Sequence, residues 1–451
     1  MGRLRQGLTT AILFAAMTGP AGAAELTRIQ SAEPDDPFAL QISVRWDHTQ
    51  ERATISREQA YAPAATTEDL NELRYSRVQN DFVTRVALAL YTDVELHAEL
   101  PYSFTDDVAW RFGTRNGMPV SASTSSIATN GIDAMGQACA VSPCPLFPVS
   151  GKDTTVFHGG KLGDLRAGLA WAIFNDRRDD TKPTWLVGLD VTFPTATLYD
   201  PATGRNGLWQ SPNAVDSNRA PSGEKVWRYD FYTALSKRIG PVDPYVKAHV
   251  TAVLPSSSTY SNCDHVGDLA IPANGAPAQM TLAAITNCSS SKWKDDAKAK
   301  LPFVAGLTFG TELVPFEDTA EGQKVSFDFR AFADYTSSSR FYNELTDASG
   351  KLHYTDAYLT MGGFAGVYLK ASRWVSLQAT ASLATKTSHW LSGESLGKGK
   401  GSVPACSDLS GASACADLNP NFDWRYDAPG NRFRISEVSV FSVGVAGVLT
   451  F

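Results

Sequence analysis

The chain ends with residues 441–451, FSVGVAGVLTF, in which bulky apolar residues alternate with small or polar ones. One face of such a strand would carry Phe441, Val443, Val445, Leu449 and Phe451. The other face would carry Ser442, Gly444, Ala446 and Thr450. A segment of about ten residues with this period has the length of a tilted strand that crosses a lipid bilayer. The last strand of a soluble β-sandwich shows the same alternation, so the rest of the chain must decide between the two.

The N-terminal end of the chain predicts export. Two arginines within the first five residues precede an apolar stretch at 8–17, and the small residues of 21–23 form a cleavage site. This order is typical of a secretory signal peptide, which we place at 1–23. Residues 24–37, which are acidic and contain two prolines, are expected to form a short periplasmic lead-in. The remaining chain contains no run of eighteen apolar residues, so we expect no membrane-spanning helix.

Alternation with a period of two recurs along the chain and predicts twelve strands. These segments are 38–49, 84–91, 94–104, 164–174, 185–197, 227–236, 246–254, 301–313, 325–335, 358–370, 375–386 and 433–451. Ten or fourteen strands also fit, if one segment is not a strand or a long connection contains a hairpin. Nearly every segment carries charge on the face opposite its apolar one. A water-filled lumen explains that pattern better than a soluble core does.

The connections between these segments alternate between short and long. The long ones are 50–71, 105–160, 198–224, 255–300, 336–355 and 387–432. All six fall on one side if the barrel begins in the periplasm, and outer-membrane barrels have long external loops and short periplasmic turns. We therefore predict an all-β protein of the bacterial outer membrane. It would be one closed antiparallel transmembrane β-barrel over 38–451.

Six cysteines fall into three close pairs, all within the long connections: Cys139 with Cys144, Cys263 with Cys288, and Cys406 with Cys415. An even number of cysteines in an exported chain predicts disulfides, and the clustering favours pairing within each pair. Metal binding is the weaker alternative, because only Cys263 has a second candidate ligand beside it, His265. We expect no metal and no cofactor.

Strand parity nominates charged residues that would line the lumen. They are Arg45, Asp47, Arg85, Glu95, His97, Glu99, Asp164, Arg166, Asp190, Arg228, Asp230, Lys247, His249, Glu312, Asp328, Arg330 and Asp334. Acids and bases often stand two residues apart on one strand face. The mixed signs favour a salt-bridged network that holds the barrel together with modest charge selectivity, and a strongly selective lining is the alternative.

Two features resemble known membrane proteins. Phe451 is the kind of final aromatic residue with which bacterial outer-membrane barrels end, and this resemblance implies recognition by the barrel-assembly machinery. Residues 163–169, GDLRAGL, followed by 185–197, WLVGLDVTFPTAT, resemble the outer-membrane transporter family named for the meta-pathway of phenol degradation. Ala196 stands where that family usually has glycine. The resemblance implies passage of small, hydrophobic organic molecules and transfers no binding residues.

These features together predict a porin-like channel for passive uptake of small solutes, of undetermined oligomeric state. Its expected partners are the solute, outer-membrane lipid and lipopolysaccharide, whose phosphates the basic stretch 397–401 would meet. The formal charge is −7, and it becomes −9 when the two arginines of the signal peptide are lost. Such a balance gives no reason to expect nucleic-acid binding.

A surface structural or adhesion protein is the competing function, since its barrel would only anchor the large loops. Small inward residues would leave space in a lumen and so favour the channel. Gly168, Gly188 and Gly306 are examples of such residues.

An outer-membrane hydrolase would need a catalytic histidine at the outer rim. His48 beside Asp47 and His353 near Asp356 are expected in that region. The chain contains no G-x-S-x-G motif, and we predict no enzymatic activity.

Overall fold

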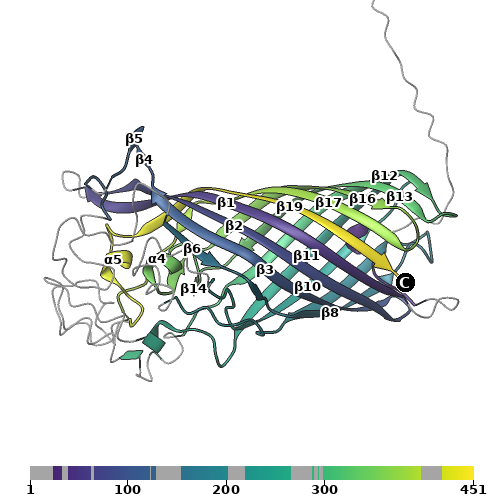
Figure 1. Ribbon diagram of the computed structural model, residues 1–451, viewed down its shortest axis with the longest axis horizontal. Coiled ribbons are helices and arrows are strands. Elements are labelled where there is room, and N and C mark those ends of the chain that lie inside the picture. Colours follow the sequence, from purple (N-terminus) through teal and green to yellow (C-terminus); the bar gives the residue numbers. More distant parts are fainter. Residues whose placement is uncertain are drawn as a thin grey trace, which may run out of the picture.

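The computed structural model describes residues 24–32, 39–61, 66–121, 123–127, 154–201, 219–265, 287–288, 293, 298–397 and 419–451. Twelve strands close into a single antiparallel barrel, as predicted (Figure 1). In order around the barrel they are β1 (Leu40–Tyr61), β2 (Thr66–Tyr91), β3 (Val94–Phe112), β8 (Arg166–Phe174), β9 (Thr184–Thr192), β10 (Val226–Ser236), β11 (Val242–Pro255), β12 (Phe303–Asp318), β13 (Gln323–Thr336), β16 (Tyr358–Lys370), β17 (Val375–Lys386) and β19 (Phe433–Thr450). Strand β1 pairs with both β2 and β19, so the sheet closes on itself.

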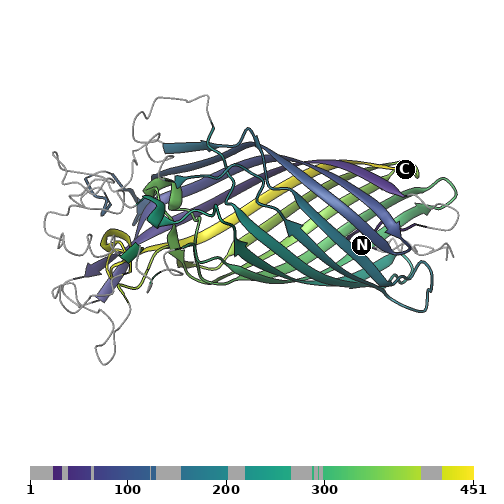
Figure 2. The same cartoon turned by 90° about the horizontal axis from the view of Figure 1, so that it is seen from below.

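The two ends of the barrel differ. Short turns such as that between β2 and β3 gather at the end where the C-terminus lies, which we call the inner end (Figure 1). The long connections leave the opposite, outer end (Figure 2). This is the alternation of short and long connections that the sequence predicts.

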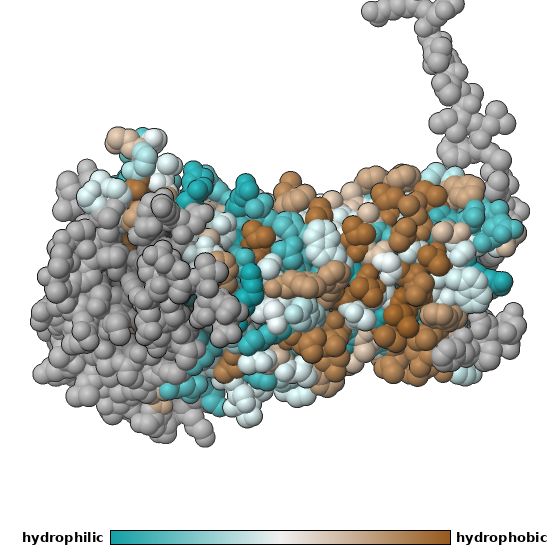
Figure 3. Space-filling view, viewed as in Figure 1, coloured by the Kyte–Doolittle hydropathy of each residue, from teal (hydrophilic) through white to brown (hydrophobic). Residues whose placement is uncertain are grey.

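An apolar belt covers the inner part of the barrel wall on the face that Figure 3 shows. Phe231 on β10 and Phe309 on β12 are 57% and 58% exposed on its outer surface. The adjacent Tyr232 points the other way and lines the lumen. Large apolar side chains facing outward around a closed barrel are stable in a bilayer, where lipid tails surround them. The barrel therefore has the surface of a transmembrane barrel.

Four strands run far beyond the apolar belt, which corrects two predicted loops. The stretch 50–71 is mostly strand, because β1 continues to Tyr61 and β2 starts at Thr66. Strand β3 likewise continues to Phe112, into the predicted loop 105–160, and β19 begins at Phe433. Two short strands, β6 (Thr154–His158) and β7 (Lys161–Leu162), pair with β3 beyond β8. The sequence signal was weak there because the outward faces of these extensions are polar.

The extensions are explained by what they enclose at the outer end, a compact cap formed by residues 339–355, 389–397 and 419–427. It contains β14 (Ser339–Phe341), β15 (His353–Thr355), α4 (Thr346–Ser349), β18 (His389–Trp390) and α5 (Trp424–Asp427). Its core is shared with the inward faces of β1, β2, β3 and β19 and includes Ile55, Leu73, Trp110, Leu345, Leu391, Tyr426, Phe433 and Ile435. Burying each large apolar side chain contributes about 1.5–3 kcal/mol, which stabilises these strands outside the membrane.

The helices of the described ranges are short. None of them is long and apolar enough to cross a membrane.

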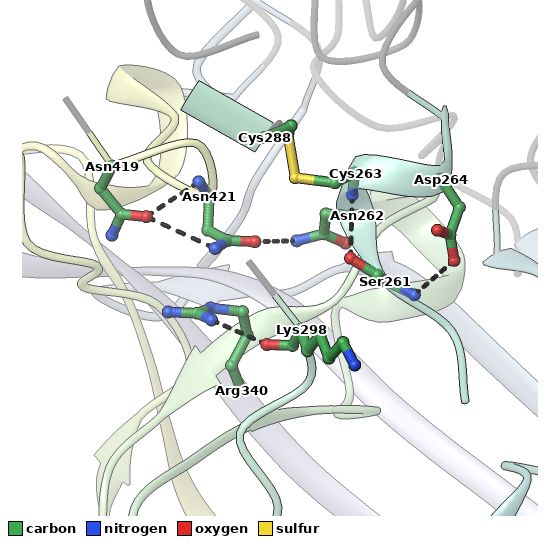
Figure 4. The surroundings of a disulfide bond; sticks show 9 residues. All are labelled: Ser261, Asn262, Cys263, Asp264, Cys288, Lys298, Arg340, Asn419 and Asn421. Carbon is green, nitrogen blue, oxygen red and sulfur yellow. Dashed lines mark hydrogen bonds between the residues drawn. A yellow bond between two sulfur atoms is a disulfide. The ribbon is translucent and has the colours of Figure 1, made fainter. Parts of the chain in front are cut away.

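One disulfide, Cys263–Cys288, supports the cap, with a Cα–Cα distance of 5.6 Å. Cys263 belongs to η2 (Asn262–His265), and the side chain of the preceding Asn262 connects two parts of the cap (Figure 4). The Asn262 amide group donates to the Leu352 carbonyl at 3.0 Å and to Oδ1 of Asn421 at 3.1 Å. The local pairing predicted for these two cysteines is the observed one. Cys139, Cys144, Cys406 and Cys415 lie outside the described residues.

Candidate functional site

Three cavities in the barrel interior are lined by residues that the structure describes. One of about 510 Å³ lies at the level of the apolar belt and is called the lumen cavity. A second of about 460 Å³, the mouth cavity, opens at the inner end and shares Arg28, Gln41 and Tyr368 with the first. The third, of about 300 Å³, lies beneath the cap and is called the outer cavity. The first two are adjacent, because they share these lining residues.

Most of the charged residues nominated by strand parity face this interior. Those that line the lumen cavity are Arg45, Asp47, Arg85, Glu95, His97, Glu99, Arg166, Asp190, Lys247 and Arg330. Arg228 lines the outer cavity instead. The other six line none of these three cavities. Five of them belong to ion pairs: Asp230, His249, Glu312, Asp328 and Asp334. The sixth, Asp164, accepts a hydrogen bond from the backbone amide of Ala196.

His97 is the centre of an ionic network on β2, β3, β8, β9 and β10. Its Nε2 lies 2.9 Å from Oδ1 of Asp190, and its Nδ1 lies 3.1 Å from Oε1 of Glu95. Arg85 pairs with Glu95 at 2.7 Å, and Arg166 pairs with Asp190. Arg166 also lies 3.4 Å from Asp230 on β10, so the network connects five consecutive strands of the wall.

A second network occupies the opposite wall, where Asp328 is surrounded by donors. Nε of Arg330 lies 2.7 Å from Oδ2 of Asp328, and the Tyr368 hydroxyl donates to the same oxygen at 3.2 Å. The Tyr245 hydroxyl donates to the other oxygen. The Arg330 guanidinium also lies 4.2 Å from the centroid of the Phe364 ring. Lining groups of both signs are therefore held in fixed positions by neighbours.

The inward glycines do not leave open space, which corrects the argument that they favour a channel. Each of them stands opposite a large side chain on the next strand: Gly188 opposite Tyr232, Gly310 opposite Tyr245, Gly362 opposite Phe332, and both Gly168 and Gly306 between a histidine and an aspartate. A Cβ atom at Gly362 would lie 2.5 Å from Cζ of Phe332. The glycines accept side chains that lie flat along the wall, and this flat packing is what keeps the lumen hollow.

The sequence did not indicate that the N-terminal segment enters the lumen. Residues 24–32, the described part of the predicted lead-in, lie inside the inner end of the barrel and include η1 (Glu25–Thr27). Ile29 packs against Ala170, Leu186 and Ala234 of the wall. The backbone amide of Gln30 donates to Oε2 of Glu95 at 2.6 Å. The apolar Leu26 and Ile29 in an otherwise polar segment are the only sequence signal of this placement.

The outer cavity is lined by ion pairs and aromatic rings. His158 Nε2 lies 3.1 Å from Oδ2 of Asp347, and its ring packs edge-on against Tyr199. Burial lowers the pKa of His158, but the adjacent Asp347 carboxylate outweighs it and leaves the pKa above its ordinary value. Arg77 makes a bidentate pair with Asp106 at 2.6 and 2.7 Å. The charged groups of His158 with Asp347 and of Arg77 with Asp106 are therefore paired with each other.

The two histidines considered for catalysis have structural surroundings, and His48 does not lie at the outer rim as expected, because β1 continues beyond it to Tyr61. His48 Nδ1 lies 2.9 Å from Oδ1 of Asn80. His353 is 2% exposed inside the cap, where its Nε2 lies 2.5 Å from Oγ of Ser349. Burial lowers the pKa of His353 well below its ordinary value. A solvent-borne substrate does not reach a side chain that is so deeply enclosed.

No group of three or more histidine, cysteine, aspartate or glutamate side chains within the described ranges is arranged to hold a metal ion.

No model of a known protein family matches this sequence, and no curated protein sequence does. Solved outer-membrane barrels show a distant likeness in structure. An outer-membrane channel from Pseudomonas putida F1 is 10% identical with a TM-score of 0.39, over 91% of this chain and 95% of that one. A FadL homologue from Pseudomonas aeruginosa is 9% identical with a TM-score of 0.31, over 92% and 90%. The outer-membrane protease OmpT from Escherichia coli is 7% identical with a TM-score of 0.27, over 94% and 100%.

Proposed function

We propose that the protein is an outer-membrane channel through which small hydrophilic solutes diffuse passively. The observation that carries this proposal is the pair of adjacent cavities, of about 510 and 460 Å³, inside the barrel and at its inner mouth. A barrel that served only as an anchor would have no need of hollow, charge-lined space in a bilayer. The ladder of hydrogen-bonded strands gives a fixed wall, which suits diffusion better than an active cycle.

The lining favours polar solutes over the hydrophobic molecules that the family resemblance implies. Ten charged or ionisable residues nominated from the sequence line the lumen cavity, and both signs are present. An apolar solute would have to displace water from these groups without replacing its hydrogen bonds, which is costly. Small ionic or zwitterionic molecules would exchange water for favourable contacts on both walls.

The cap supports one alternative, a surface structural or adhesion protein. It covers the outer end with a built apolar core and a disulfide, more than a passive channel requires. In that case the inner cavities would be filled with water but would not connect the two sides of the membrane.

We also propose that Phe451 serves as the signal for the barrel-assembly machinery. Its amide donates to the Leu40 carbonyl at 2.7 Å, and its side chain is 51% exposed at the inner end. The last residue therefore completes the closing strand pair while its ring stays available. Residues 398–401 of the basic stretch, for which we propose contact with lipopolysaccharide, lie outside the described residues.

Single-channel conductance in a planar bilayer tests the channel. Steady openings of the purified barrel support the proposal. A matched pair of variants on β17 locates the path: Ser382 lines the lumen cavity, and its neighbour Leu383 is 62% exposed on the outer surface. Ser382→Trp should reduce the conductance, whereas Leu383→Trp should leave it unchanged. A silent bilayer for the wild-type barrel would favour the surface protein.

A further inference from the structure

Ala24, the first described residue, is buried inside the inner end of the barrel, with 0% of its surface exposed. Its carbonyl accepts hydrogen bonds from the amide of Thr27 at 2.9 Å and from Oγ1 of Thr27 at 3.1 Å. Thr27 Oγ1 in turn lies 2.8 Å from Oγ of Ser236 at the end of β10. Ala24 is thus fixed to the wall rather than suspended in the lumen.

Two buried carboxylates lie in this part of the wall. Ser236 stands opposite Thr184 on β9, and Thr184 Oγ1 donates to Oδ1 of Asp176 at 2.8 Å. Asp243 is on β11 at the same end, and the charge that acts on it most strongly is that of Asp176. The exposed fractions of Asp176 and Asp243 are 3% and 1%.

These carboxylates lack the partners that buried acids need. Oδ2 of Asp176 and both carboxylate oxygens of Asp243 have no hydrogen-bond partner among the described residues. The adjacent acid Glu312 does have one, since Lys324 Nζ lies 2.5 Å from its Oε1. Arg238 is likewise occupied by Glu317 at 2.6 Å. Lys324 and Arg238 act on Asp243 only from a distance, and a buried carboxylate without a hydrogen-bond donor is unfavourable, so the arrangement calls for a further cation beyond those of the described residues.

We propose that Asp176 and Asp243 form a binding site for the α-ammonium group of Ala24. That group would be created when the signal peptide, 1–23, is removed. Hydrolysis of the Ala23–Ala24 peptide bond adds one water: the hydroxyl completes a carboxylic acid on Ala23, and the nitrogen of Ala24 becomes an amine that takes up a proton. An amide with one N–H and no charge is replaced by a cation with three N–H donors. Its three donors match the three unpartnered oxygens in number, and its charge is opposite in sign to theirs.

The site would attach the N-terminal segment to the barrel wall at a second point. With the ammonium bound at one end and Gln30 bonded to Glu95 at the other, residues 24–32 would be held across the inner mouth at two points. A chain that still carries its signal peptide would have only the hydrogen bond between Gln30 and Glu95. Removal of the leader would therefore fix the segment in its final position.

The experiment uses the full-length protein purified from membranes in its folded state. Sequencing should show that the chain starts at Ala24. The probe is an amine-reactive acetylating ester near neutral pH, and mass spectrometry follows acetylation of the N-terminal peptide. In the folded barrel the α-amine should react at least about tenfold more slowly than in the denatured chain. Reaction at equal rates, or a chain that starts elsewhere, would overturn the proposal without bearing on conductance.

Variants distinguish an ammonium site from simple burial. Asp243→Asn and Asp176→Asn should each raise the acetylation rate of the folded protein, because the remaining contacts no longer hold a charged group. Asp180→Asn, an exposed position in the turn that also carries Asp176, is the control and should leave the rate unchanged. Equal protection in all three variants would contradict the assignment of the two acids. If the buried variants do not assemble, the pH dependence of the wild-type acetylation rate decides: an α-ammonium group held by two carboxylates should show an apparent pKa above the ordinary value of about 7.7–8.0, and an apparent pKa at or below that value would contradict the site.

Discussion

Tyr232 lies flat across Gly188, its direct partner on the neighbouring strand, so that a Cβ atom at Gly188 would fall well inside van der Waals contact with the ring. The Tyr232 ring is itself part of the lumen lining, and Lys247 Nζ lies 4.5 Å from its centroid. Because Gly188 on β9 has no side chain, the Tyr232 ring on β10 can lie against the wall, and Lys247 on β11 can lie over that ring.

Gly188→Ala should destabilise the barrel and reduce its conductance. The methyl group would push the Tyr232 ring away from the wall and into the lumen, and overpacking of this kind costs about 1–3 kcal/mol. Denaturant unfolding of the lipid-embedded barrel and single-channel recording measure the two effects. The double variant with Tyr232→Ser should recover both quantities. Full stability of Gly188→Ala alone would show that the ring is not confined.

Lys247→Gln should shift the channel toward cations. Among the described residues, Arg166 and Arg330 are paired with aspartates, whereas Lys247 forms no ion pair and lies over the Tyr232 ring. Removing its charge would reduce the excess of cationic side chains that line the lumen cavity and so favour anions less. The reversal potential in a salt gradient measures the change. Lys161→Gln, at an exposed position outside the lumen, should have no effect, and an equal shift in both variants would contradict the assignment.

Phe309→Arg should impair membrane assembly, whereas Thr308→Arg should be tolerated. Phe309 is 58% exposed within the apolar belt, and its neighbour Thr308 has the opposite parity. An arginine facing lipid near the middle of the bilayer costs about 2–4 kcal/mol, but one facing a wet lumen keeps its water. Folding into lipid vesicles across a denaturant series measures the free energy of folding of each variant. Similar losses at both positions would refute the parity of β12.

Replacing Cys263 and Cys288 with serine should loosen the cap and leave the barrel intact. The disulfide closes a loop with a sequence separation of 25 residues, and its removal is expected to cost about 2–4 kcal/mol. Hydrogen exchange should accelerate at Leu352, whose amide donates to Asn262. Amides in the belt, such as those of β12, serve as the internal control. Unchanged exchange at Leu352 would mean that the disulfide does not position Asn262.

Acidification should weaken the cap through His353. Its pKa in the folded cap is well below the ordinary value because of burial, so below about pH 6.5 only the unfolded form takes up a proton. The contribution of His353 therefore falls as the pH falls, by up to about 1.4 kcal/mol per pH unit. Burial raises the pKa of Asp427 to about 7, so protonation of Asp427 acts in the opposite direction over the same range.

Comparison with His353→Gln isolates this effect, because Asp427 contributes equally to both proteins. The stability advantage of the wild type over the variant should be largest above neutral pH and should shrink toward pH 5. Hydrogen exchange of cap amides, corrected for intrinsic rates, measures it. A constant difference between the two proteins would show that His353 is protonated in the folded cap.

The barrel could be predicted from the sequence because strand parity is a local property. Alternation along β10 is enough to separate Phe231 from Tyr232, and the twelve predicted segments match the twelve strands. Connection lengths then predicted which end of the barrel carries the short turns. Both signals depend on residues that are close together in the chain.

The interior could not be predicted because it depends on strand register and on distant contacts. His97 and Asp190 are 93 residues apart, and nothing near either residue indicates the other. The glycines were interpreted as space because the sequence does not show which side chain lies opposite each one. The cap was missed for the same reason, since its core combines Ile55 with Leu345 and Phe433.

The shared core of the cap has a consequence for the order of assembly. It joins residues of the first two strands, Ile55 and Leu73, to Phe433 on the last, and these become neighbours only when β1 pairs with β19. Contacts of such long sequence separation form late, after the intervening chain has been ordered. The cap should therefore appear only once the wall has closed. Protease resistance at the cell surface would then report that insertion of the barrel is complete.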